Sequence, residues 1–157
     1  MPRIAVTGHR QLPADVERAV DTAVRARLAA VAGPLTGLSC LADGADTLFA
    51  RAVLDAGGDL EVVVPAAGYR DALPAGHHDA YDALMAAAAR IHRLAHRASS
   101  PAAHMDAGRH LVDHCDEVVA VWDGRPARGY GGTADIVGYA RSRRRPVTVV
   151  WPAGAAR

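Results

Sequence analysis

Short apolar runs rich in β-branched residues alternate along the chain with longer segments whose apolar residues recur every three or four positions. The short runs predict strands, and the longer segments predict helices with one apolar face. We expect strands at residues 3–8, 35–41, 60–66, 90–95, 116–122 and 146–152, and helices at 14–33, 45–58, 79–91, 99–115 and 131–144. This alternation is typical of an α/β sandwich of three layers, in which helices cover both faces of a mostly parallel central sheet.

Glycine, proline and serine mark several expected boundaries. Gly33 follows the first helical pattern, as a C-terminal cap does, and Pro65 is expected to end the third strand. Pro74 interrupts the next helical pattern, so a loop is expected there. Ser100 and Pro101 suit the cap and the first position of a helix, which is therefore predicted to begin at that point.

The composition fits one domain that spans residues 1–157. Half of the residues are apolar, but no uncharged apolar run is long enough to cross a membrane. The N-terminus lacks the pattern of a secretory signal, and Cys40 and Cys115 lack a redox spacing, so we expect a cytoplasmic protein with two reduced thiols. The net charge of +1 offers no broad basic surface, which argues against nucleic acid and membranes as partners.

Glycine gathers in the turns where a parallel sheet binds its ligands. Ligands bind at the carboxyl ends of the strands, and the turns that follow four predicted strands contain glycine. The richest is WDGRPARGYGGTAD at residues 122–135, directly before a predicted helix. Such a turn exposes backbone N–H groups at the positive end of a helix dipole.

This turn is predicted to hold a phosphate on Gly131, Gly132 and Thr133. The Thr133 hydroxyl adds a donor, and Gly129 allows the loop to fold back. The alternative is that these glycines only make a tight turn and let helix and sheet pack closely.

Polar side chains beside the earlier turns are further candidates. His9 and Arg10 can donate hydrogen bonds to a phosphate, Arg10 through both arms of its guanidinium. Asp43 and Asp46 either hold ribose hydroxyls or cap the helix that begins there.

Histidine spacing does not predict a metal site. His110 and His114 lie four residues apart on one helical face, but no glutamate stands between them as in the zinc motif, and His104 is the one further candidate nearby. We therefore expect a pair that faces solvent and assign neither a metal nor a cofactor.

Five segments carry a resemblance to a known group: IAVTGHR, GLSCLADGADTLFARAVL, VVVPAAGYRDAL, GRHLVDHCDEVVAVWDG and GYGGTADIVGYARSRRRPVTVV. In this order they resemble the SLOG superfamily, which includes the DNA-processing protein Smf/DprA and the LOG cytokinin-activating phosphoribohydrolases. The resemblance spans nearly the whole chain. It implies a Rossmann-like fold, a homodimer, and a nucleotide or nucleotide-derived ligand whose phosphate lies on the GGT turn. Base or ribose would lie across the loops after the first three strands.

The resemblance also bears on catalysis. LOG enzymes carry the motif P-G-G-x-G-T-x-x-E, whose glutamate is catalytic. Aligned on Thr133, this sequence has Ile136 at that place and Asp135 one residue earlier. An isoleucine cannot move a proton, so Asp135 is the candidate catalytic residue if there is one.

Together, these patterns predict a binding protein or sensor for a nucleotide or nucleotide-derived small molecule. The alternative is a nucleotide N-glycosidase or a LOG-like 5′-monophosphate phosphoribohydrolase. The expected ligand-binding residues are Gly8, His9, Arg10, Asp43, Gly44, Ala45, Asp46, Arg109, Asp123, Gly124, Gly129, Gly131, Gly132 and Thr133.

Overall fold

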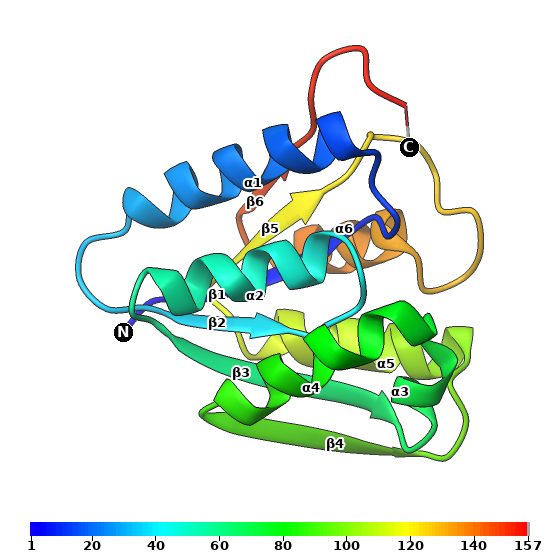
Figure 1. The fold of residues 1–157 in the computed structure, drawn as a ribbon. Coiled ribbons are helices and arrows are strands. Elements are labelled where there is room, and N and C mark those ends of the chain that lie inside the picture. Colours follow the sequence, from blue (N-terminus) through cyan, green and yellow to red (C-terminus); the bar gives the residue numbers. More distant parts are fainter. Residues whose placement is uncertain (157) are drawn as a thin grey trace.

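The centre of the molecule is a six-stranded sheet in which every strand pair is parallel (Figure 1). The structure is a computed structural model that describes residues 1–156. Its strands are β1 (Arg3–Gly8), β2 (Thr36–Ser39), β3 (Asp59–Ala66), β4 (Arg90–His96), β5 (Glu117–Val121) and β6 (Val147–Val150). Their order across the sheet is β4-β3-β2-β1-β5-β6, so the chain crosses the sheet after β4 and continues on the other side of β1.

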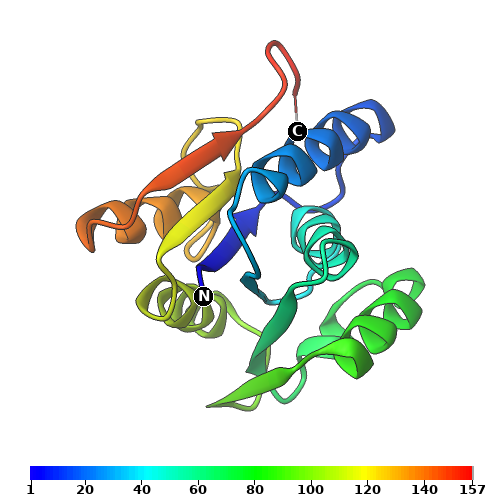
Figure 2. The same ribbon diagram turned by 90° about the vertical axis from the view of Figure 1, so that its left-hand side faces the viewer.

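Helices cover both faces of this sheet. They are α1 (Ala14–Ala29), α2 (Ala45–Asp55), α3 (Tyr69–Ala72), α4 (His78–Ala87), α5 (Pro101–Asp113) and α6 (Thr133–Ser142), with a 3₁₀ turn, η1 (Ala75–His77). Figure 2 shows α1, α2 and α4 on one face and α5 and α6 on the other. The predicted three-layer α/β sandwich is therefore confirmed. Within residues 1–156, no helix is long and apolar enough to span a bilayer.

The middle of β1 is apolar at consecutive positions, because both faces of the sheet are covered there. Ile4, Ala5 and Val6 of β1 are at most 1% exposed. Ile4 and Val6 belong to the core beneath α1 and α2, whereas Ala5 belongs to the core beneath α5 and α6. Buried parallel strands have this continuous apolar pattern, in which alternation between polar and apolar positions is lost.

Several expected boundaries differ from those of the structure. The third strand ends at Ala66, as its expected range does, but Pro65 does not end it, because Pro65 lies inside β3 at a register shift against β4. Proline lacks the N–H that the ladder needs, and a local irregularity accommodates it next to an edge strand. The first helix ends at Ala29, before the expected stop at Gly33. The loop expected around Pro74 contains the short α3 and η1.

The predicted start of α5 is confirmed in detail. The Ser100 hydroxyl oxygen accepts a hydrogen bond from the Ala103 N–H (3.1 Å), and Pro101 occupies the first helical position. Farther along, Gly108 lets α5 approach α6, because a Cβ there would lie 2.0 Å from Ile136 Cδ1. This close crossing brings the N-terminus of α6 beside the first turns of α5.

One buried carboxylate ties together strands that are not neighbours. Glu61 of β3 is 6% exposed and accepts hydrogen bonds from Arg3 Nη1 (2.7 Å) and Arg3 Nη2 (3.2 Å). His92 Nε2 of β4 lies 3.1 Å from the Glu61 carboxylate. The Arg3 guanidinium, aided by His92, lowers the pKa of Glu61 to about 2. The cluster therefore joins β1, β3 and β4.

The pKa of Glu61 predicts a pH dependence of stability. A carboxyl group whose pKa is depressed on folding stabilises the protein above its unfolded pKa, and this stabilisation is lost as pH falls toward 2. We expect Glu61→Gln to lower the free energy of unfolding at pH 7 by about 2 to 3 kcal/mol. The difference from the parent should shrink between about pH 4.5 and pH 2. Urea unfolding at several pH values measures this, with the exposed Glu17→Gln as control; a pH-independent difference would contradict the prediction.

Candidate functional site

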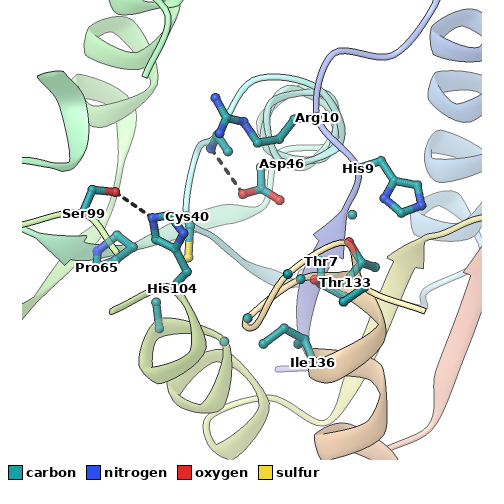
Figure 3. Close-up of a pocket in the computed structure, with 18 of the residues that line it drawn as sticks. Thr7, His9, Arg10, Cys40, Asp46, Pro65, Ser99, His104, Thr133 and Ile136 are labelled. Carbon is teal, nitrogen blue, oxygen red and sulfur yellow. Dashed lines mark hydrogen bonds between the residues drawn. The ribbon is translucent and has the colours of Figure 1, made fainter. Parts of the chain in front are cut away.

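A cavity of about 840 Å³ opens at the carboxyl edge of the sheet (Figure 3). Its walls come from the loops after β1 and β2, from α3 and α5, and from the loop between β5 and α6. The connections that leave β1 and β5 go to opposite faces of the sheet, and this divergence leaves a crevice between them. The cavity therefore lies at the edge of the sheet where the glycine-bearing turns meet, the edge that sequence reasoning indicated for a ligand.

Eight of the expected ligand-binding residues line this cavity: Gly8, His9, Arg10, Asp46, Gly129, Gly131, Gly132 and Thr133. Six do not line it: Asp43, Gly44, Ala45, Arg109, Asp123 and Gly124. The candidate catalytic residue, Asp135, is also outside the lining. Contact of the eight with a ligand stays a prediction.

The glycine-rich loop reaches the cavity through the first turn of α6. Gly131 N–H donates to Asp135 Oδ2 (2.9 Å), and Gly132 N–H donates to Gly129 O (3.3 Å). Thr133 and Ala134 are the first two residues of α6, and the first N–H groups of a helix have no carbonyl partner within the helix. No residue in 1–156 accepts a hydrogen bond from either of these two N–H groups. Of these two residues Thr133 lines the cavity, so its amide is the donor that the cavity offers to an anion.

Two of the loop glycines allow close approaches, although not between helix and sheet. Gly131 has a φ of +83°, and a Cβ there would lie 2.7 Å from the Pro101 carbonyl oxygen of α5. A Cβ on Gly132 would lie 2.8 Å from Ala127 Cβ, within the loop itself. Glycine at these positions thus serves the shape of the loop and its seat on α5.

Asp135 stabilises this loop through its bond to Gly131. The neighbouring Ile136 lines the cavity and packs against Gly108. An apolar side chain therefore occupies the place that the LOG motif would give to a glutamate. The carboxyl group that does line the cavity is Asp46.

His9 and Asp123 form a buried pair beside the cavity. The Asp123 N–H donates to His9 Nε2 (3.1 Å), which also lies 3.3 Å from Asp123 Oδ1. The His9 ring packs edge-on against Trp151. Figure 3 shows the His9 ring directed away from Arg10. His9 thereby joins the loop after β1 to the loop after β5.

Arg10 and Asp43 form an ion pair at the mouth of the cavity. Arg10 Nε donates to Asp43 Oδ1 at 2.8 Å. Asp43 does not cap α2, whose cap residue is Gly44. Gly44 has a φ of +87°, and a Cβ there would lie 2.7 Å from the His9 carbonyl oxygen. Gly44 therefore serves the contact between two loops.

Asp46 lines the cavity from the start of α2, next to Arg10 in Figure 3. Its Oδ2 accepts a hydrogen bond from the Ala42 N–H (3.2 Å). Burial, only partly offset by this bond and by the Arg10 charge, raises the pKa of Asp46 to about 7. A carboxyl group that titrates near neutral pH in a cavity marks a candidate functional residue.

Sequence reasoning missed the opposite wall. Tyr69 of α3 and His104 of α5 line the cavity with their rings 6.0 Å apart, and Ser99 Oγ lies 2.7 Å from His104 Nε2. Burial lowers the pKa of His104, which is therefore neutral at pH 7. Cys40 lines the same wall as a free thiol. Only the position of Tyr69, directly after Gly68 in a strand-to-helix turn, could have indicated this wall from sequence.

Two residues of the β5–α6 loop were also missed. Arg128 and Tyr130 line the cavity from the loop that covers it. Arg109 Nη2 donates to the Tyr130 hydroxyl (3.2 Å), and Arg109 Nη1 donates to Asp106 (3.2 Å). Arg109 is thus an anchor of the loop on α5.

The histidine pair lies on another surface, in a shallow second pocket. The rings of His110 and His114 stack with centroids 4.0 Å apart, and His92 lies 5.0 Å from His110. His110 is partly buried, so the expectation of a pair facing solvent is wrong for that residue. Within residues 1–156, no three His, Cys, Asp or Glu side chains converge on a metal position.

No family model and no curated protein matches this sequence. Solved structures do share its fold. DNA processing protein A (DprA) from Streptococcus pneumoniae matches with a TM-score of 0.70 and 19% identity, over 98% of this chain and 51% of DprA. This chain therefore spans about half the length of that protein. DprA from Helicobacter pylori matches with a TM-score of 0.67 and 13% identity, over 99% of this chain and 68% of that protein. The molybdenum cofactor binding protein of the phototrophic bacterium Rippkaea orientalis matches with a TM-score of 0.59 and 15% identity, over 94% of this chain and 75% of that protein.

The expectation that nucleic acid is an unlikely partner is wrong. It rested on the net charge of +1, yet the Helicobacter pylori DprA structure that shares this fold describes a single-stranded DNA binding mode. Binding depends on the charge at the contact surface, which net charge does not report. The resemblance to a group that includes DprA is confirmed at the level of the fold: this chain has a Rossmann-like α/β fold that DprA shares.

Proposed function

We propose that this protein is a binding protein or sensor for a nucleotide or nucleotide-derived small molecule, held with its phosphate at the N-terminus of α6. The observation that carries the proposal is the cavity at the carboxyl edge of the sheet, with Thr133, the first residue of α6, in its lining. A helix N-terminus attracts anions through its N–H groups and its dipole. A volume of about 840 Å³ lies within the usual range for small-molecule sites.

Cationic side chains support a phosphate at this end. Arg128 lines the cavity, and no carboxylate within residues 1–156 forms an ion pair with it. Arg10 lines the cavity closer to Asp46 and His104, and Asp43 shares its charge. A phosphate group would accept charge-assisted hydrogen bonds from the Arg128 guanidinium. The comparison with DprA is consistent with this ligand class, since DNA is itself a chain of nucleotides.

Binding without hydrolysis is the reading favoured by the side chains around α6. Ile136 offers no proton-transfer group, and Asp135 is bonded to the Gly131 N–H outside the cavity lining. Hydrolysis of an N-glycosidic bond remains the alternative function. Incubation of the purified protein with nucleoside 5′-monophosphates should release no free base, by chromatography. Base release abolished by Asp135→Asn would replace the binding proposal with hydrolysis.

Gly132→Val tests the phosphate end. The valine would collide with Ala127, so the loop must shift, and neither residue belongs to the core beneath α6. Losing two charge-assisted hydrogen bonds should weaken binding about a hundredfold or more, with little change in Tm. Arg10→Ala should cost less. Calorimetric titration with a panel of nucleoside 5′-monophosphates, beside a melting curve, measures both quantities.

The matched control is Gly138→Val, within the helix that Gly132 precedes, where a Cβ meets open space. It should keep the parent affinity. Full affinity in folded Gly132→Val protein would instead mean that glycine at this position serves loop packing alone.

Arg109→Ala tests the anchor of the loop. If Arg109 holds the loop and does not contact the phosphate, its removal should speed hydrogen exchange at residues 124–131 and weaken nucleotide binding by less than about tenfold. Arg143→Ala, which removes a cation near Asp113 on the same side of the molecule, is the control. A larger loss of affinity with unchanged exchange would identify Arg109 as a ligand contact.

A further inference from the structure

We propose that Asp46 recognises the part of the ligand remote from the phosphate, by accepting hydrogen bonds from it as a carboxylate, so that binding at neutral pH releases a proton. This inference rests on the proposed function and deepens it. It specifies that the ligand presents hydrogen-bond donors, either a ribose diol or the N–H groups of a base, at the position of Asp46.

The local structure presents one oxygen of Asp46 to the cavity. Asp46 is the second residue of α2, and its main-chain carbonyl accepts a hydrogen bond from Ser39 Oγ (3.1 Å). Its Oδ2 accepts from the Ala42 N–H. No residue in 1–156 donates a hydrogen bond to Oδ1. The carboxyl group is thus held on one side and has an acceptor left for a ligand.

The charged and titratable groups around Asp46 come from several elements. Arg10 and His9 lie in the loop after β1, Asp43 in the turn before α2, Cys40 after β2, Tyr69 on α3, His104 on α5 and Arg128 in the loop before α6. Burial raises the pKa values of Cys40 and Tyr69 and lowers that of His104, so all three are uncharged at pH 7. His9 is held by Asp123, and Arg10 is paired with Asp43.

The arrangement therefore keeps the Asp46 carboxyl near half-protonation at neutral pH, with its pKa at about 7. Its surroundings hold neutral hydrogen-bonding groups on Tyr69, His104 and Ser99 and the Arg10–Asp43 ion pair, whereas Arg128 and Thr133 line the cavity from the loop before α6 and from its first turn. The two ends match a ligand that is anionic at one end and neutral and polar at the other.

Whether affinity rises or falls with pH depends on which form of Asp46, ionised or protonated, the ligand binds. A ligand that donates to the carboxylate lowers the pKa of Asp46, so binding tightens as pH rises. With a pKa of about 7, the ionised fraction rises from roughly a tenth at pH 6 to roughly nine tenths at pH 8. Affinity should rise about tenfold over this range, beyond the part due to the second ionisation of the phosphate near pH 6.

The test is calorimetric titration of the parent protein with AMP, GMP, CMP, UMP and inorganic phosphate in buffers of different ionisation heat. The parent should release about half a proton per bound nucleotide at pH 7. Asp46→Asn should abolish this release and the tenfold rise, while its affinity for inorganic phosphate stays unchanged. Asp71→Asn, at an 89% exposed side chain outside the cavity, should behave as the parent.

Two further arms separate the donors. Loss of proton release with 2′,3′-dideoxy-AMP assigns the donors to the ribose, and loss with IMP in place of AMP assigns them to the base. Asp46→Asn should also raise Tm at pH 8, because a raised pKa means that folding disfavours the ionised form. A residue with only a structural role would lower Tm.

The outcomes distinguish the role of Asp46 from nucleotide binding itself. Proton release that persists in Asp46→Asn, or affinity that falls as pH rises, would overturn this inference and leave nucleotide binding in place. Absence of binding of every nucleotide and of phosphate by the parent protein would overturn the proposed function, and this inference with it.

Discussion

The close contact of the end of β1 with α2 and β5 is the constraint on which the site depends. A Cβ on Gly8 would lie 2.5 Å from Ala45 Cβ and 2.7 Å from Val121 Cβ. One residue later, the His9 N–H donates to Val121 O (3.0 Å), and the His9 carbonyl accepts from Ala45 N–H (3.1 Å). These contacts seat the loop after β1 between α2 and β5, and the cavity opens beside it.

This constraint accounts for residues that sequence reasoning assigned to the ligand. Gly8, Gly44 and Ala45 stand where backbones meet too closely for larger side chains. His9 is held by Asp123, and Arg10 pairs with Asp43, so these groups first satisfy one another. A glycine here can serve both packing and ligand binding. The close contacts that require glycine also bring polar residues at the ends of several strands and helices to one cavity.

Electrostatics in this molecule act locally. A net charge of +1 conceals a buried carboxylate with a pKa of about 2, Glu61, and a cavity carboxyl with a pKa of about 7, Asp46. The two pKa values differ because the two carboxyl groups have different partners. Arg3 and His92 compensate the burial of Glu61. Arg10 forms its ion pair with Asp43 and compensates the burial of Asp46 only in part. The same local view explains why net charge was a poor guide to nucleic acid as a partner.

The sequence by itself determined the sandwich, the strands and the edge where the site lies, because apolar periodicity and glycine-bearing turns are local properties of the chain. It also indicated Ser100 as a helix cap and Asp46 as a site candidate. Only the tertiary structure decided that Asp46 faces the cavity while Asp43 pairs with Arg10, and that Asp135 supports the loop at Gly131. The wall formed by Tyr69, Ser99 and His104 likewise depends on how α3 and α5 pack together at the carboxyl edge of the sheet. Contacts between elements distant in sequence leave no periodic pattern, so they emerge only when the elements pack.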